Sequence, residues 1–465
     1  MKITQIILRR TASLRTSLRN VSQCCSGPKS ISTQSSKGYT DPPLYISSID
    51  AEPLHRYHQG GYHPVILGEF LHSGRYKLLH KLGWGGYSTV WLARDQRLYD
   101  KYESPGIEAN WKYFRYRDEV YVAIKIGVAE AYGKEMRELQ VTKQLATSCP
   151  RPKHTVLMLE NFHVKGPNGS HNCLVFELLG PNIPDIIDAH FPHGRLPGKL
   201  AKEIAKQSLI GLRSLHEHNL GHGDPKLFEP LSHGVDIHTR NLVFTVPGVH
   251  NLTEEKIMEI LGAPEVGHVQ RCDGKDLGPG VPEYIVRPIS HWTRCWNPDS
   301  TQSIKLIDFG EAFLQPAPPQ VLHTPLSVRA PEVLFEDRID YRVDMWSMGC
   351  MLFELFTGQP PFDSFLITPG ILVGQMRETA GDNLPERWHD KWIKMRAGDD
   401  YATAEEPRPS LQEWLEEVYF DHPQSPDLTR EDVARLGHII GTLLQFEPSA
   451  RASAGQVLDD PWFKE

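Results

Sequence analysis

The sequence predicts an α+β fold of two lobes, a small lobe built on an antiparallel β-sheet with one helix and a larger, mainly α-helical lobe. The first observation is that residues 68–128 contain three stretches suited to strands, two of them joined by a glycine-rich turn. Apolar residues at helical spacing follow, as one buried helix face requires: Leu200, Ile204, Leu209, Leu212 and Leu215. Strands first and helices later are typical of two separate lobes.

The individual elements follow from local patterns. Residues 75–95 and 119–128 predict strands, and residues 129–145 predict a helix. Residues 173–179 predict a short apolar strand that leads into the large lobe. Further helices are expected at Val343–Phe356, Leu411–Val418 and Glu431–Leu444. Residues 246–302 and 375–428 are rich in Pro, Gly, Asp and Trp without clear periodicity, and we interpret them as insertions within the large lobe.

The predicted domain spans residues 75–463, with the small lobe at 75–179 and the large lobe at 180–463. Residues 41–74 are interpreted as a linker, and residues 1–40 as a basic, Ser-rich extension with seven Lys or Arg and no Asp or Glu. This composition predicts a mitochondrial presequence, and the alternative is a basic tail without a targeting signal.

Charge and cysteine usage narrow the function classes. The whole chain carries −8 and the extension +7, which leaves −15 on residues 41–465 and favours a basic protein partner over nucleic acid. No run approaches the roughly 18 apolar residues of a membrane-spanning helix. The seven cysteines form no CxxC pair, so the sequence predicts free thiols and no zinc site.

A glycine-rich hairpin is the first candidate binding feature. The stretch "GWGGYSTV" places Gly83, Gly85 and Val90 in the spacing GxGxxGxV, with Ser88 at the third glycine position. Small residues at such a turn let backbone N–H groups approach phosphate oxygens.

A lysine and a carboxylate follow. Lys125 ends "VAIK" inside a predicted strand, where its ammonium can reach phosphate groups if a carboxylate holds it. Glu138 on the next helix is the best candidate for that carboxylate, and Glu135, one turn earlier, is the alternative. Asp308 begins "DFG" after a short apolar strand, a position that suits Mg²⁺ because this ion prefers oxygen ligands.

The order of these elements resembles the eukaryotic protein kinase family. After "DFG" come "APE" at residues 330–332, "DMWSMG" from Asp344 and an arginine at Arg451, and the six elements cover residues 70–463. In that family Asp344 and Arg451 are expected to brace the large lobe. The resemblance implies ATP and Mg²⁺ as cofactors and a non-specific protein serine/threonine kinase activity.

The stretches "GGYHPVILGEFLHSGRYKLLHKLGWGGYSTVWLARD" and "CLVFELLG", and the position of the insertion after Asn241, resemble the SR-protein kinases of the CMGC group. This narrower resemblance implies basic, Ser-rich and Arg-Ser-rich protein substrates, no direct nucleic-acid binding, and a monomer. It also implies a cytoplasmic or nuclear location, against the mitochondrial one that the extension predicts.

The resemblance carries over to individual positions. Lys125 is implied to be catalytic, and Asn241 and Asp308 to hold Mg²⁺. The implied nucleotide contacts are Leu82, Gly83, Trp84, Gly85, Gly86, Val90, Ala123, Lys125, Glu138, Phe176, Glu177, Leu179 and Asp308.

The catalytic loop offers two aspartates, whereas the family pattern HRDxxxxN needs one. Asp224 follows His222 and Gly223 as the pattern asks, but Asp236 lies five residues before Asn241. Because carboxylate and amide must converge on one phosphoryl group, we favour Asp236 with Asn241, and Asp224 stays as the alternative. Residues 225–236 are interpreted as a natural insertion or as an error in exon joining, and in the second case the natural protein would use Asp224.

Two other functions stay open on the sequence. A pseudokinase scaffold would bind nucleotide without transferring phosphate, because the loop insertion could disrupt catalytic geometry. A small-molecule phosphotransferase would share an "HGD" loop, but such enzymes typically lack the "APE", "DMWSMG" and Arg451 elements present here.

Overall fold

The computed structural model describes residues 43–97, 120–129, 134–223, 238–297, 303–322, 324–362, 368–397, 410–422 and 425–464. The chain divides into two units, Met1–Pro43 and Leu44–Glu465. Apart from Pro43, the first unit lies outside the described residues, as does the predicted presequence. All of the described helices and strands belong to the second unit.

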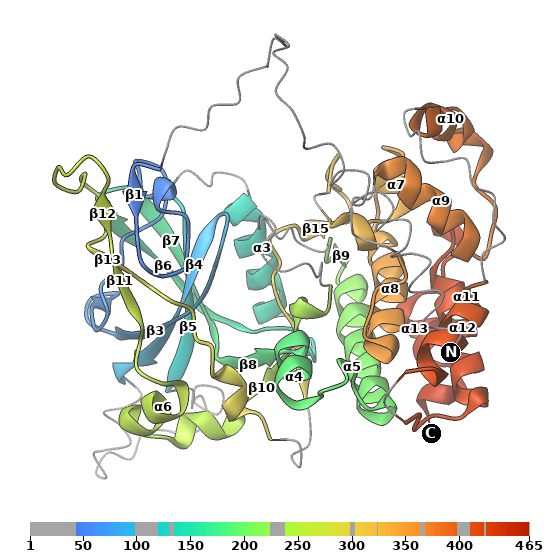
Figure 1. Cartoon of the computed structure of the whole chain (residues 1–465), viewed down its shortest axis with the longest axis horizontal. Coiled ribbons are helices and arrows are strands. Elements are labelled where there is room, and N and C mark those ends of the chain that lie inside the picture. The colour runs from blue at the N-terminus through green and yellow to red at the C-terminus, as the bar shows by residue number, and fades with distance from the viewer. Residues whose placement is uncertain are drawn as a thin grey trace, which may run out of the picture. The chain divides into compact units, whose positions relative to one another are not determined.

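The small lobe is built on a six-stranded antiparallel sheet in the order β2-β3-β4-β5-β7-β6, with helix α3 beside it (Figure 1). Its elements are β2 (Phe70–Leu71), β3 (Tyr76–Gly85), β4 (Ser88–Asp95), β5 (Tyr121–Gly127), α3 (Lys134–Thr147), β6 (Met158–Gly166) and β7 (Gly169–Glu177). The predicted strands and helix of this lobe are therefore confirmed.

Side chains alternate between the two faces of the sheet, and both faces are buried. In β5, Val122, Ile124 and Ile126 belong to one buried cluster, whereas Tyr121 belongs to the cluster on the other face. Side chains two residues apart lie on the same face of a strand, so Lys125 shares the face of Tyr121. Each fully buried aliphatic side chain contributes roughly 1.5–3 kcal/mol.

The segment interpreted as a linker, residues 41–74, is part of the small lobe. Its strand β2 pairs with β3, and Val65 and Leu71 are buried in the sheet core. A short strand β1 (Tyr45–Ile46) lies further upstream. The lobe therefore begins well before residue 75, because these apolar side chains complete its core.

The large lobe is mainly helical, as predicted. Helix α8 runs through its centre, since all of its residues are buried. The α-helices are α4 (Ile183–His190), α5 (Gly198–Glu217), α7 (Pro331–Leu334), α8 (Val343–Thr357), α9 (Pro369–Thr379), α10 (His389–Ala397), α11 (Leu411–Phe420), α12 (Arg430–Leu443) and α13 (Ala454–Leu458). None of the helices within the described ranges is both long and apolar enough to cross a bilayer.

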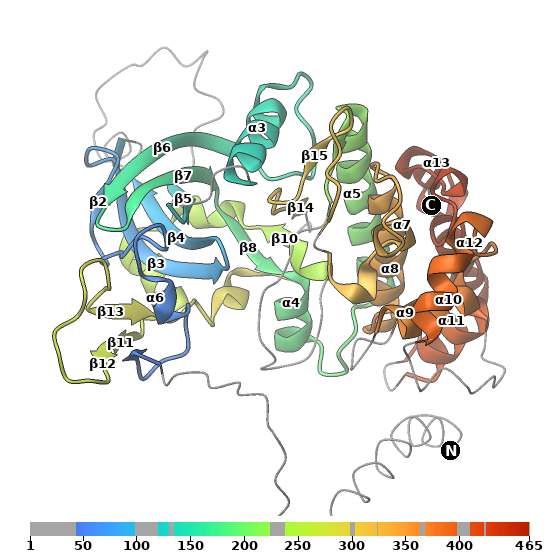
Figure 2. The same cartoon turned by 90° about the horizontal axis from the view of Figure 1, so that it is seen from above.

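Short strands connect the lobes. A three-stranded sheet has the order β14-β10-β8, and β15 pairs with β9. These strands are β8 (Leu179–Asn182), β9 (Leu220–Gly221), β10 (Leu242–Thr245), β14 (Ile304–Leu306) and β15 (Phe313–Leu314). Figure 2 shows β8, β10 and β14 between the large sheet and helices α5 and α8.

The first insertion differs from its expected place. Residues 246–297 lie between β10 and β14 in sequence, but both views show α6 and β11–β13 on the small lobe (Figures 1 and 2). Trp296, near the end of the segment, packs against Phe191 and Phe244 of the large lobe. Ile257 and Leu261 of α6 join the cluster of Leu79 and Leu92, because the segment lacks a core of its own. Its elements are α6 (Glu254–Leu261), β11 (Val266–His268), β12 (Gln270–Arg271) and β13 (Tyr284–Val286).

The second insertion stays in the large lobe. Within residues 375–428 the structure describes the end of α9, all of α10 and all of α11, and the ring of Trp388 stacks on that of Phe335 at 4.7 Å. The fold is completed by single 3₁₀ turns: η1 (Leu54–Arg56), η2 (His238–Asn241), η3 (Pro247–Asn251), η4 (Trp292–Cys295), η5 (Leu326–Val328), η6 (Glu386–Trp388), η7 (Pro448–Ala450) and η8 (Pro461–Phe463).

Candidate active site

The centre of the site is an ion-pair network that joins the two lobes. Lys125 Nζ on β5 lies 2.7 and 2.9 Å from the two carboxylate oxygens of Glu138 on α3. The same ammonium lies 3.5 Å from Asp308 Oδ1, which follows β14. The structure therefore selects Glu138 as the partner of Lys125, and the side chain of the alternative, Glu135, lies outside the described part of the chain.

Burial and charge act against each other in this network. Burial lowers the pKa of Lys125, but the carboxylates of Glu138 and Asp308 outweigh it and hold the pKa above its ordinary value. The pKa of the Glu138 carboxyl lies above its ordinary value. Burial raises this pKa most, the charge of Asp308 raises it further, and Lys125 lowers it only in part. Lys125 is thus a fixed ammonium, suited to binding phosphate oxygens.

The glycine-rich hairpin of β3 and β4 lies next to the strand that carries Lys125. In the β3–β4 ladder Gly83 pairs with Val90 and Gly85 with Ser88, and in the β4–β5 ladder Val90 pairs with Lys125. A Cβ added to Gly83 or Gly85 would meet no heavy atom within 4 Å. The hairpin therefore leaves open space next to its backbone, as an approaching phosphate group requires.

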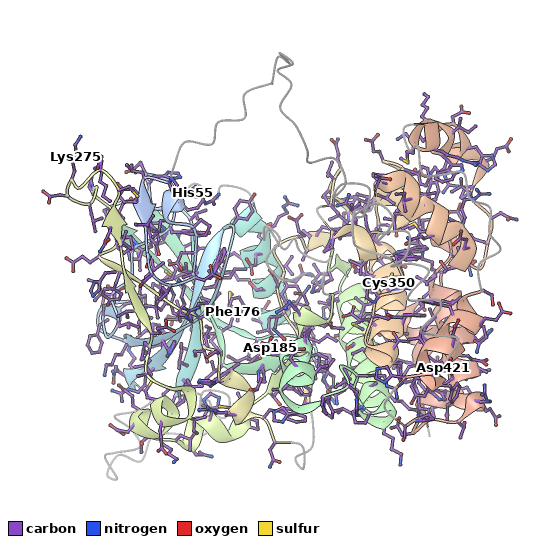
Figure 3. All side chains as sticks on the ribbon, viewed as in Figure 1. His55, Phe176, Asp185, Lys275, Cys350 and Asp421 are labelled. Atoms are coloured by element: carbon purple, nitrogen blue, oxygen red, sulfur yellow. The ribbon has the colours of Figure 1, made fainter. Side chains whose placement is uncertain are left out.

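Apolar positions line the strands beside the lysine. Ala123 pairs with Leu92 on one side and with Phe176 on the other, and Leu82 packs in the same cluster as Ala123. Phe176 is buried where the sheet meets the large lobe (Figure 3). Trp84 and Gly86 are partly exposed and belong to the hairpin tip. These positions lie on the strands beside Lys125, and their role as nucleotide contacts stays a prediction.

Glu177 and Leu179 lie in the connection between the lobes. The Glu177 carboxylate is paired with Lys305, and it accepts a hydrogen bond of 2.6 Å from the Leu157 N–H, so its side chain has a structural partner. The Leu179 carbonyl accepts a hydrogen bond of 3.0 Å from Trp292 Nε1. Trp292 was missed by sequence reasoning, because it lies in the insertion, 113 residues from Leu179.

Asp308 occupies a special backbone conformation. Its φ of 65° lies in the left-handed region, which is rare for residues other than glycine. The Gly310 N–H donates to Asp308 Oδ1 at 3.3 Å. The neighbouring Phe309 is buried with its ring edge-to-face against His222 at 5.3 Å. This packing turns the Asp308 side chain towards Lys125.

Asn241 lies next to Asp308 through the β10–β14 pairing. Leu242 pairs with Leu306, and the Ile307 N–H donates to the Asn241 carbonyl at 3.0 Å. This pairing brings the backbones of Asn241 and Asp308 close together, and their side chains are of the oxygen-bearing kinds that Mg²⁺ prefers. No cluster of three or more His, Cys, Asp or Glu suited to a metal occurs in the described ranges. Mg²⁺ is commonly bound by one or two protein side chains together with phosphates and water, so Asp308 and Asn241 are residue types that fit this ion.

Both candidate catalytic aspartates, Asp224 and Asp236, lie outside the described residues. The flanks of this loop are well anchored. The N–H groups of His222 and Gly223 donate to the Asp344 carboxylate at 2.8 and 2.9 Å. On the other flank, the Thr239 hydroxyl donates to Glu354 at 2.7 Å.

The two residues expected to brace the large lobe make buried contacts. His216 Nε2 lies 2.9 Å from Asp344, and although burial raises the pKa of Asp344, this partner and the loop N–H groups lower it below its ordinary value. The Arg451 guanidinium donates two hydrogen bonds of 2.7 Å to Glu332 and a third of 2.9 Å to the Arg342 carbonyl. Both residues thus support the loops around the site.

A partly exposed acidic position lies beside the catalytic loop. Asp185, at the start of α4, lies 3.7 Å from Arg240 Nη1. Burial raises the pKa of Asp185, Arg240 lowers it and Asp188 raises it, and the pKa stays above its ordinary value. Figure 3 shows Asp185 at the junction of the lobes.

Comparisons with known proteins give the family and relatives that this chain resembles. A family model described as protein kinase domain matches residues 298–463. The serine/threonine-protein kinase SRPK of Physarum polycephalum is 27% identical over 88% of this chain and 90% of its own length. Protein kinase dsk1 of Schizosaccharomyces pombe is 27% identical over 88% of this chain and 84% of its own length. A crystallographic kinase domain covers 86% of this chain and 98% of its own, with a TM-score of 0.52 and 19% identity, and supports the fold.

Proposed function

The chain belongs to the protein kinase family, and from that premise we propose that it is an active serine/threonine kinase of the SR-protein kinase type, using ATP and Mg²⁺. The observation that carries the proposal is the Lys125–Glu138 pair of the small lobe, set 3.5 Å from Asp308 of the large lobe. These are the residue types that phosphoryl transfer needs, because such catalysis depends mainly on positioning and charge.

Each residue has a defined task in this proposal. Lys125 binds phosphate oxygens, held by Glu138, and the backbone of the hairpin at Gly83 and Gly85 surrounds the phosphates. Asp308 and Asn241 would hold Mg²⁺, which when bound neutralises charge on the phosphates. Leu82, Ala123 and Phe176 give the adenine an apolar surface.

For the catalytic base we propose Asp236, acting with Asn241, and keep Asp224 as the alternative. The Thr239 contact to Glu354 and the Asn241 contact to Ile307 support the loop on the side of Asp236. The base must accept the proton of the substrate hydroxyl as the phosphoryl group is transferred.

The proposed substrates are basic, Ser-rich proteins, and the enzyme acts on them as a monomer. The charge of −15 on residues 41–465 favours cationic partners, and Asp185 offers a carboxylate at the junction of the lobes. The relatives named SRPK and dsk1 support the assignment to protein substrates. Transfer to an Arg-Ser peptide should exceed transfer to a Lys-poor, acidic Ser peptide of equal length, and equal rates would count against this preference.

The proposed activity is tested by phosphate transfer from labelled ATP to a basic Ser-rich peptide. Lys125→Ala and Asp308→Ala should each lower the rate at least about 10²-fold, because each removes an electrostatic contact to the transferred group. Lys77→Ala is the matched control, since Lys77 is also a small-lobe lysine paired with a glutamate, Glu254, away from the site. Unchanged rates in the first two variants would refute the proposal.

The alternative of a pseudokinase scaffold gives a different result in the same experiments. A scaffold would bind ATP through Lys125 and Asp308, but it would transfer no phosphate to protein. Nucleotide binding without transfer by the full chain would therefore identify it, and choline or aminoglycoside phosphorylation would identify a small-molecule enzyme.

A further inference from the structure

We propose that Arg56 and Tyr62 are positioning residues for the phosphates of the nucleotide, through the tip of the glycine-rich hairpin. Both lie on Glu52–Tyr62, a segment upstream of the sheet that we call the strap. This inference rests on the proposed function, because it concerns how the chain holds ATP. It assigns a binding role to residues that sequence reasoning interpreted as a linker.

Two side chains of the strap contact the hairpin tip directly. The Tyr62 hydroxyl donates a hydrogen bond of 2.8 Å to the Gly85 carbonyl. The Arg56 guanidinium donates to the next carbonyl, that of Gly86. Arg56 also lies over the rings of Tyr62 and Tyr87, with its guanidinium carbon 5.4 and 6.0 Å from their centroids. The strap thus holds two consecutive peptide groups of the turn.

Because a peptide group is planar, a contact that fixes its carbonyl also fixes the direction of its N–H. The peptide unit is planar and trans, so its C=O and the following N–H point in opposite directions. Fixing the Gly85 carbonyl on the strap directs the Gly86 N–H away from it. In the same way, fixing the Gly86 carbonyl directs the Tyr87 N–H away from the strap. These two N–H groups are therefore presented together, as binding of an anion requires.

The turn needs such support because of its composition. Gly85 pairs with Ser88 at the end of the β3–β4 ladder, so the turn lies beyond the last ladder pair. Glycine loses more conformational freedom on ordering than other residues. Contacts that order this turn before the nucleotide arrives reduce that cost of binding.

The strap is itself firmly held. Tyr62 is 1% exposed, and Glu52 forms a buried ion pair with Lys81, two residues before Gly83. The Tyr62 N–H donates to the Arg56 carbonyl at 3.0 Å, and this tight turn requires Gly61, because a Cβ there would lie 1.8 Å from that carbonyl oxygen. The strap can therefore act as a rigid support.

The test compares the affinity for ATP with that for adenosine, which lacks phosphates. In Tyr62→Phe only the hydroxyl is lost, and the Kd and KM for ATP should rise about 3- to 10-fold, the effect of one hydrogen bond. The Kd for adenosine and the KM for the peptide should stay unchanged. Arg56→Met, which removes the guanidinium, should act in the same direction.

Tyr121→Phe is the matched control. Tyr121 is fully buried in the same lobe, and its hydroxyl also donates to a backbone carbonyl, that of Leu252, at 2.9 Å, but away from the hairpin tip. It should change neither affinity. Thermal unfolding of every variant checks the fold, and Arg56→Met carries the test if Tyr62→Phe fails to fold.

Two results would overturn the inference, and they are distinguishable. If the natural chain binds ATP and both strap variants keep its ratio of ATP to adenosine affinity, the strap does not position the phosphates. If the natural chain binds no ATP at all, the proposed function falls and this inference falls with it.

Discussion

Replacing the two carboxylates around Lys125 one at a time should separate stability from catalysis. Glu138→Gln and Asp308→Asn each remove one negative charge and keep the shape of the side chain. Glu138 is closer to the ammonium, at 2.7 Å against 3.5 Å for Asp308. The side chain of Glu138 is 6% exposed, whereas that of Asp308 is 38% exposed. The same chemical change therefore acts in two different environments.

The magnitudes follow from burial. Removing one partner of a buried ion pair costs ~3–5 kcal/mol, because it leaves an uncompensated charge. Lys125 is itself 22% exposed and keeps Asp308, so we expect Glu138→Gln to lower the free energy of unfolding by about 2–4 kcal/mol. For Asp308→Asn, solvent screening limits the loss to about 1 kcal/mol or less.

Activity should show the opposite order. Asp308→Asn should lower the rate of phosphate transfer at least about 10²-fold, because this carboxylate is proposed to hold the metal at the phosphates. Glu138→Gln displaces Lys125 without removing it, and about a 10-fold loss is expected. Urea unfolding followed by tryptophan fluorescence gives the stabilities, and transfer to a basic peptide gives the rates. A larger stability loss in Asp308→Asn than in Glu138→Gln would refute this reasoning.

Further outcomes are expected elsewhere. Arg451→Met should destabilise the large lobe by about 3–5 kcal/mol in urea unfolding, because it leaves Glu332 buried without its cation. Ile257→Ala should cost about 2–5 kcal/mol and loosen the insertion from the small lobe, as hydrogen exchange would report. In transfer assays Asp236→Asn should lower the rate more than Asp224→Asn, because its spacing to Asn241 suits catalysis. A fluorescent fusion should reach mitochondria only when residues 1–40 are present.

Each of these has a contrary result. Arg451→Met with unchanged stability would show that the buried pair is dispensable, and unchanged exchange in Ile257→Ala would deny the role of α6. A larger loss in Asp224→Asn would make Asp224 the base, and deletion of residues 225–236 should then raise the rate. A purely cytoplasmic or nuclear signal from the full chain would exclude the mitochondrial address.

Much of the site could be predicted because its signals are local. Lys125 sits in a strand whose apolar alternation is plain, and Glu138 lies one helix further on. Asp308 follows a short apolar strand, as predicted, and the structure describes that strand as β14. The sequence also predicts helix α5, because its apolar face repeats at helical spacing.

The rest depends on contacts between distant segments, which local patterns do not report. Tyr62 and Glu52 lie in a stretch rich in Tyr, His, Gly and Pro, and only the position of the hairpin and of Lys81 makes them core residues. Ile257 faces a sheet formed by residues far earlier in the chain. Trp292 meets Leu179 only when the insertion folds back on the small lobe.

Because the insertion after β10 packs on the small lobe, the core of that lobe can be completed only after the insertion has been synthesised. Synthesis passes the end of β7 about 110 residues before it reaches Val286, which belongs to the core of the same sheet. At ~5–20 residues per second the ribosome needs roughly 5–20 s for that stretch. During this delay the sheet lacks part of its cover, and exposed apolar surface of this kind attracts chaperones. Chains stalled at residue 240 should therefore be more sensitive to protease in the small lobe than chains stalled beyond residue 330.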